Sequence, residues 1–167
     1  MRLFAAIRLS DTMKAPLLQV QRQLQELGIE GRYTPESQLH LTLAFIGEQP
    51  EVQPSLDALS SLSFSPFEVT LQGLGSFGTL WWAGIRESAP LCALAHSFRS
   101  ALSAAGIPYD DAPFLPHITL LRKASKPLPQ ILIPPACMTV AAVHLLRSDP
   151  GAAGMVYTEV GRRDAQR

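Results

Sequence analysis

Two of the four histidines lie in near-identical tetrapeptides, His40-Leu41-Thr42-Leu43 and His117-Ile118-Thr119-Leu120. With 4 His and 8 Thr in 167 residues, chance gives about 0.2 His-x-Thr matches, so two matching copies are a specific signal. Side chains alternate along a strand, which puts each histidine and its threonine on one face and the aliphatic residues on the other. The second copy begins 77 residues after the first, and we therefore predict two related lobes whose strands line one cleft.

This pattern suits acid–base chemistry on a phosphodiester. Histidine alone has an unperturbed pKa near neutral pH, so one imidazole can accept a proton while the other donates one. The hydroxyls of Thr42 and Thr119 can donate hydrogen bonds to the oxygens on phosphorus. Arg122, five residues after His117, can add positive charge. The residues alone do not distinguish the acid from the base.

Other readings of the motif fit less well. A single His-x-Thr in an apolar strand is commonly a locally satisfied, half-buried pair, but a second copy argues against this. A metal site is disfavoured because threonine is a poor zinc ligand and the nearby carboxylates lack ligand spacing. A serine hydrolase is disfavoured because no G-x-S-x-G elbow occurs. The carboxylates considered are Glu36, Glu48, Asp110 and Asp111.

Aromatic residues near the motifs are candidates for stacking a nucleobase. Trp81 and Trp82 alternate on one strand, so we expect one in the core and the other exposed. Phe45 is the second candidate, but a regular strand would turn it to the core side with Leu43, and stacking would need a twist or bulge. We assign no role to His96 or His144.

The elements that carry these residues follow from hydrophobic periodicity and turn residues. We expect helices from Ser10 or Asp11 to about Leu27 and from Pro90 to Ala105, and a weaker helix from Glu51 to Leu62. Polar loop is expected from Gly31 to Gln38, an extended connection from Lys123 to Pro135, and a frayed end from Arg162. The expected strands are 3–9, 39–46 (stopped by Gly47), 67–71 and 80–85 around a Gly-rich turn, 118–121, 138–147 and 155–160. This mixed order predicts an α+β fold.

Composition narrows the class of protein. Hydrophobic residues make up 47% and charged residues 17% of the chain, which indicates a folded domain. Lys+Arg and Asp+Glu both number 14, which disfavours a long duplex-binding surface but allows a site for one or two phosphates. Two cysteines are too few for a disulfide scaffold, and no targeting or membrane segment is apparent. We expect a cytoplasmic protein with reduced thiols.

The sequence resembles the two-histidine (2H) phosphoesterases, specifically the bacterial RNA 2′,3′-cyclic phosphodiesterases, also called 2′-5′ RNA ligase-like proteins. The matching stretches are Arg2-Leu3-Phe4-Ala5-Ala6-Ile7, Leu39 to Glu48, Trp82-Ala83-Gly84 and Pro116 to Arg122. The first strand departs from the pattern at Ile7-Arg8-Leu9-Ser10, where an acidic residue and a proline are expected. The resemblance implies one 2H phosphoesterase domain over residues 1–167, with two pseudo-symmetric lobes, antiparallel sheets lining a central cleft and helices outside.

The resemblance also implies an activity, the metal-independent opening of a 2′,3′-cyclic phosphate at an RNA 3′ end to a 2′-phosphate. By that resemblance His40 is the proton donor, His117 the proton acceptor, and Thr42, Thr119 and Arg122 bind the phosphate. The expected partners are RNA 3′ ends or short oligonucleotides, with no cofactor, metal or membrane, and the protein is expected to be a monomer. Two alternatives stay open: a 2′-5′ RNA ligase or 2′-5′ oligonucleotide phosphodiesterase, and a non-catalytic RNA-end-binding module.

Overall fold

The computed structural model describes residues 1–166 and has the predicted α+β class. The helices are α1 (Asp11–Glu26), α2 (Gln53–Ser60), α3 (Ala89–Ala104) and the short 3-10 helix η1 (Glu36–Gln38). The strands are β1 (Arg2–Arg8), β2 (Arg32–Tyr33), β3 (His40–Glu48), β4 (Phe67–Phe77), β5 (Leu80–Ile85), β6 (His117–Arg122), β7 (Cys137–Val140), β8 (Ala142–Gly151) and β9 (Gly154–Asp164).

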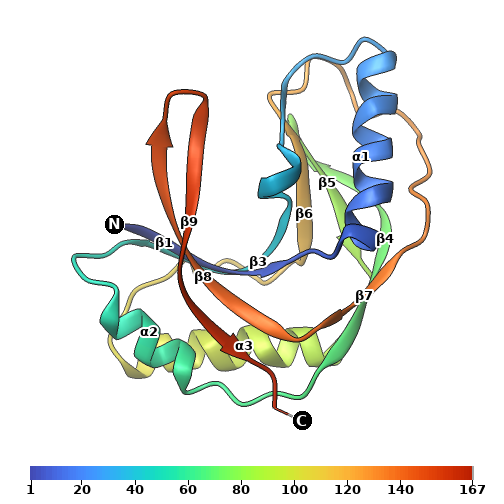
Figure 1. Ribbon diagram of the computed structural model, residues 1–167. Helices are drawn as coiled ribbons and strands as arrows, with labels where there is room; N and C mark the ends of the chain where they lie inside the picture. Colours follow the sequence, from blue (N-terminus) through green and yellow to red (C-terminus); the bar gives the residue numbers. More distant parts are fainter. Residues whose placement is uncertain (167) are drawn as a thin grey trace.

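The strands form two antiparallel sheets, and each holds one copy of the histidine motif. One sheet has the order β3-β1-β8-β9 and the other β2-β6-β5-β4-β7. In Figure 1 the β8–β9 hairpin stands opposite β5 and β6, with α1 flanking the second sheet and α2 and α3 lying under the first. Buried residues of both sheets and of the three α-helices form one contiguous hydrophobic core. That the two sheets belong to two related lobes stays a prediction.

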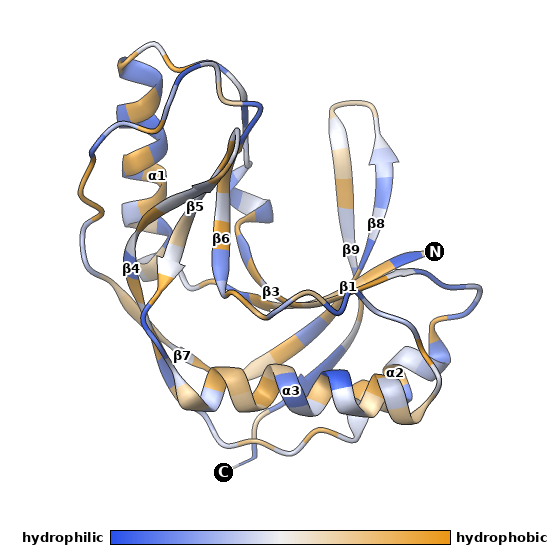
Figure 2. Cartoon of the chain, turned by 180° about the vertical axis from the view of Figure 1, so that it is seen from behind, coloured by the Kyte–Doolittle hydropathy of each residue, from blue (hydrophilic) through white to orange (hydrophobic). Residues whose placement is uncertain are grey.

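Two of the predicted helices are confirmed with their caps. Ser10 Oγ accepts a hydrogen bond from Met13 N (3.2 Å) at the start of α1, and Ser88 Oγ accepts one from Leu91 N (3.3 Å) at the start of α3. Gly28 and Gly106, with φ of 76° and 71°, follow their ends and adopt the left-handed conformation that favours glycine. Each helix buries an apolar stripe, visible as orange bands in Figure 2, but the last residue of each predicted stripe, Leu27 in one and Ala105 in the other, lies past the helix end and is exposed.

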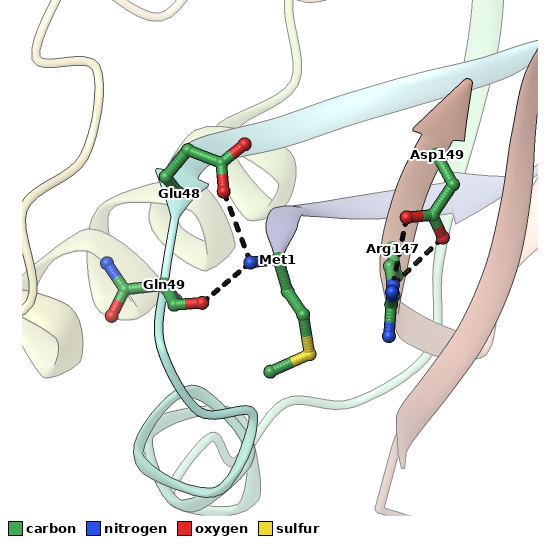
Figure 3. A network of polar contacts seen from close by, with 5 residues as sticks. All are labelled: Met1, Glu48, Gln49, Arg147 and Asp149. Carbon is green, nitrogen blue, oxygen red and sulfur yellow. Dashed lines mark hydrogen bonds and ion pairs between the residues drawn. The ribbon is translucent and has the colours of Figure 1, made fainter.

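The start of β1 is tied to the end of β3. The Met1 amino group donates to Glu48 Oε2 (3.1 Å) and to the Gln49 carbonyl oxygen (2.8 Å), as Figure 3 shows. These contacts supplement the β1–β3 ladder, whose register places His40, at the other end of β3, opposite Arg8. Gly47 lies inside β3, so the prediction that it stops this strand is wrong.

The expected Gly-rich turn is much shorter than predicted. The predicted strand 67–71 continues as β4 to Phe77, and β5 begins at Leu80 after Gly78 and Thr79. Gly75 is a ladder residue, paired with Trp82, and a Cβ atom on it would lie 2.3 Å from the indole ring. Here glycine makes room for a large neighbour in the sheet and does not break the strand.

The predicted strand 138–147 is in fact two strands in different sheets. β7 pairs with β4, whereas β8 pairs with β1, and the break falls at Ala141. The predicted frayed end is also wrong over the described residues, because β9 continues to Asp164 and the Ala165 amide donates to the Ala141 carbonyl oxygen (2.8 Å). The final residue of that segment, Arg167, lies outside the described residues.

The segment predicted as loop before the first motif contains short structured pieces. β2 pairs with β6 and η1 leads directly into β3. Gln21 of α1, itself buried, donates to the carbonyl oxygens of Thr34 (2.9 Å) and Leu120 (3.0 Å). These bonds fasten the loop and the second motif strand to the same helix.

Candidate active site

Both motif histidines are oriented by the same local hydrogen bond. His40 Nδ1 lies 2.6 Å from the Gln38 carbonyl oxygen, and His117 Nδ1 lies 2.7 Å from the Leu115 carbonyl oxygen, two residues earlier in each case. A carbonyl oxygen only accepts, so Nδ1 carries the proton in both rings and Nε2 is left for chemistry. His40 Nε2 lies 2.9 Å from Thr42 Oγ1, which unites the first imidazole–hydroxyl pair. This shared geometry does not distinguish acid from base.

A bulge in β3 turns Phe45 to the same face as His40. The β1–β3 register skips Leu43, because Ala44 pairs with Ala5 and Thr42 with Ala6. The bulge breaks the alternation, so both Leu43 and Ala44 are buried while Phe45 is 45% exposed. The expectation that Phe45 shares the core side of Leu43 is therefore wrong, and the bulge that base stacking requires is present.

A second bulge does the same for Arg122. In the β5–β6 ladder Trp82 pairs with Thr119 but Trp81 pairs with Leu121, so Leu120 is skipped. Leu120 and Leu121 are both buried, and Arg122 is exposed. One face of each motif strand therefore carries the histidine and the residues two and five positions after it. We call this the motif face.

Each histidine stands against two aromatic rings. The His40 ring centroid lies 5.2 Å from that of Phe4 and 5.6 Å from that of Tyr157. The His117 centroid lies 5.3 Å from that of Phe77 and 6.0 Å from that of Trp82. These rings restrict how the imidazoles can turn and partly shield them from water.

Burial and neighbouring charge lower the pKa of His40. Removal from water is the main cause, and the positive charges of Arg122 and His117 act in the same direction, partly opposed by the bond to the Gln38 carbonyl. These residues of β6 are thus within electrostatic reach of His40, and β3 and β6 are in contact. The contact between β3 and β6 therefore brings both histidines and Arg122 into one region.

The other residues singled out from the sequence differ in how far they are exposed. Thr119 is half-buried on the motif face of β6, opposite Trp82 of β5. Trp81 is 2% exposed and belongs to the core, whereas Trp82 is half-exposed, as the alternation predicts. His96, to which no role is assigned, is exposed on α3.

Three of the aromatic neighbours, Phe4, Tyr157 and Phe77, were not singled out from the sequence. They lie far from their histidines along the chain, and an aromatic residue in a strand ordinarily packs in the core. Phe4 carries the one available signal, because the motif-like stretch Arg2-Leu3-Phe4 lies in the strand that pairs with β3. Tyr157 and Phe77 lie near hairpin turns whose register the sequence does not fix.

Gly75 provides the space in which Trp82 lies beside His117. We expect Gly75→Ala to lower the free energy of unfolding by about 1–3 kcal/mol, because its methyl group would overlap the indole. Displacement of Trp82 should also shift the tryptophan emission maximum. Urea unfolding followed by fluorescence measures both, with the exposed neighbour Ser76→Ala as the control. An unchanged emission maximum and stability in Gly75→Ala would contradict this contact.

Residues 1–166 contain no group of three or more His, Cys, Asp or Glu side chains arranged to hold a metal ion. None of the helices in that range is long and apolar enough to span a membrane. Cys92 and Cys137 are exposed free thiols.

The site can be compared with known proteins. Residues 6–152 match the model of the 2′-5′ RNA ligase superfamily. A protein of Thermus thermophilus named RNA 2′,3′-cyclic phosphodiesterase is 34% identical, with 99% of this chain and 96% of that protein covered. A protein of the same name from Escherichia coli is 38% identical over 63% of this chain and 61% of that protein.

Solved structures agree with the sequence matches. The apo form of E. coli LigT superimposes with a TM-score of 0.83 at 30% identity, covering 99% of this chain and 98% of that one. LigT in complex with 3′-AMP superimposes with a TM-score of 0.82 at the same identity and coverage. The family match spans both histidine motifs. The chain belongs to the 2′-5′ RNA ligase superfamily.

Proposed function

We propose that this protein is an RNA 2′,3′-cyclic phosphodiesterase that hydrolyses the cyclic phosphate at an RNA 3′ end to a 2′-phosphate without a metal ion. The observation that carries the proposal is the pair of histidines with the same Nδ1–carbonyl orientation, each beginning a motif strand. Two relatives that bear this name align over 99% and 94% of the chain. We expect the protein to act as a monomer in the cytoplasm.

The proposed reaction uses one histidine on each side of phosphorus. His117 Nε2 takes a proton from water, and the water oxygen forms a bond to phosphorus. The bond from phosphorus to the ribose 3′ oxygen breaks, and His40 Nε2 gives that oxygen its proton. The hydroxyls of Thr42 and Thr119 and the guanidinium of Arg122 stabilise the charge on the non-bridging oxygens.

The lowered pKa of His40 bears on these roles. In the free protein burial favours neutral His40, whereas a proton donor must start charged. A bound phosphodiester brings a negative charge next to the ring, and an opposite charge raises the pKa of a histidine. Substrate binding therefore counteracts the effect of burial and charges the donor when it is needed.

We further propose that the terminal base stacks on Phe45 or Trp82. Phe45 presents nearly half of its side chain on the His40 face, next to Phe4 at a centroid distance of 6.2 Å. Trp82 contacts Phe77, which is 48% exposed, beside His117. Stacking on aromatic rings tolerates all four bases, so weak base preference is expected.

Product analysis tests the function. A short oligoribonucleotide ending in a 2′,3′-cyclic phosphate, incubated with the protein in excess chelator, should give a 2′-phosphate end. A 3′-phosphate product or dependence on added metal would contradict the proposed mechanism. Joining of tRNA halves would favour the ligase, cleavage of 2′-5′ oligomers the related phosphodiesterase, and tight binding of a nucleoside 2′-phosphate without any turnover the binding module.

A further inference from the structure

A polar cluster of Arg8, Glu159 and His144 lies on the His40 face of the first sheet, outside the residues assigned above. Arg8 pairs with His40 across β1 and β3, and cross-strand partners share a face. His144 of β8 pairs with Ala6, which in turn pairs with Thr42. Beside this cluster, Phe4, Ala6, Leu146 and Tyr157 form a small apolar patch on that face.

The cluster holds Arg8 in a defined direction. The Glu159 carboxylate accepts a hydrogen bond from Nδ1 of His144. His144 is only 8% exposed, so this bond fixes the carboxylate to a buried side chain. The same oxygen lies 3.5 Å from Arg8 Nε. Among residues 1–166 Glu159 is the only ion-pair partner of Arg8, whose side chain is 49% exposed. About half of the Arg8 side chain thus remains accessible to a ligand.

The direction of Arg8 separates it from the reacting phosphate. Glu159 lies on β9, on the far side of β1 from His40, so Arg8 reaches away from β3 across the sheet. Neighbouring strands are about 4.8 Å apart, so a guanidinium that reaches from β1 toward β9 lies between one and three strand spacings from β3 in the order β3-β1-β8-β9. This range includes the spacing of successive phosphates along a nucleic-acid strand.

We propose that Arg8 binds a second phosphate of the substrate, the one on the 5′ side of the terminal nucleotide. A guanidinium is suited to this task, because its planar fork of donors matches phosphate oxygens two at a time. The inference rests on the proposed function, since it presumes a terminal nucleotide seated at the histidines. It makes the enzyme selective for 5′-phosphorylated or oligomeric ends over a bare nucleoside cyclic phosphate.

Binding measurements test this inference separately from turnover. By calorimetry, the wild-type protein should bind adenosine 2′,5′-bisphosphate about tenfold more tightly than adenosine 2′-phosphate. Arg8→Ala should bind the two equally, with its affinity for the 2′-phosphate unchanged. Arg8→Lys, which keeps the charge but loses the fork, should retain part of the preference. Arg22→Ala removes the same charge from the exposed face of α1 and should bind as the wild type.

Turnover then identifies the source of the phosphate. Arg8→Ala should lower kcat/KM about tenfold for a dinucleotide ending in a cyclic phosphate and leave the unphosphorylated nucleoside cyclic phosphate unaffected. An equal loss with the 5′-phosphorylated mononucleotide shows a site for any 5′ phosphate, and a larger loss with the dinucleotide shows that the site prefers the internucleotide diester. If Arg8→Ala weakens both adenosine ligands equally, or neither, the inference is wrong. If binding behaves as expected but no cyclic phosphate is hydrolysed, only the proposed function fails.

Discussion

Alanine in place of His40 or His117 is expected to lower kcat for hydrolysis of a 2′,3′-cyclic phosphate by about 10²–10⁴-fold. Each imidazole performs one proton transfer in the proposed reaction, and neither can take over the other's transfer from its place on a different sheet. Initial rates with a nucleoside 2′,3′-cyclic phosphate in chelator give the loss. Unchanged turnover in either variant would refute the two-histidine mechanism.

The double variant sharpens this test. If the histidines act as a unit on one phosphorus, replacing both should cost little more than replacing one, because a single loss already disables the concerted step. Independent roles would instead multiply the two losses. His96→Ala is the matched control, since this histidine is exposed on α3, and it should retain full activity. Thermal unfolding of each variant checks that the fold survives.

Some residues of the motif face can be predicted from the sequence, and others cannot. Alternation places His40 with Thr42 and His117 with Thr119 from the sequence alone, because each pair is two residues apart in a strand. Alternation fails for Phe45 and Arg122, which lie five residues after their histidines. Each reaches the motif face through a bulge that depends on pairing with a neighbouring strand. Such pairing is a tertiary property, which a reading of the single strand does not contain.

Dependence on pairing with other strands also explains the errors in the predicted fold. The apolar run 138–147 has the composition of one strand, and only the competition of β4 and β1 for its two halves divides it at Ala141. Gly75 likewise carries the local signal of a turn, but the size of Trp82 on the paired strand is what requires it. The bounds of α1 and α3, whose apolar stripes and terminal glycines are local features, lie within one residue of the prediction.

A substrate with sulfur in place of the 3′ bridging oxygen should restore activity to the variant that lacks the acid. A thiol has a pKa near 8.5, well below that of a ribose hydroxyl, so a thiolate leaves without being protonated. With the cyclic 3′-thio substrate, the loss in His40→Ala is expected to shrink from about 10²–10⁴-fold to less than about tenfold. His117→Ala should keep its full loss, because water must still be deprotonated. Initial rates measured with both substrates give the comparison.

This comparison assigns the roles that geometry leaves equal. The Nδ1–carbonyl bonds are the same for both rings, and the lowered pKa of His40 in the free protein by itself favours a proton acceptor there. Rescue confined to His117→Ala would therefore reverse the proposed roles. The pH profile offers an independent check with the wild-type protein. With the oxygen substrate kcat/KM should fall at high pH as the acid loses its proton, and with the sulfur substrate that fall should disappear.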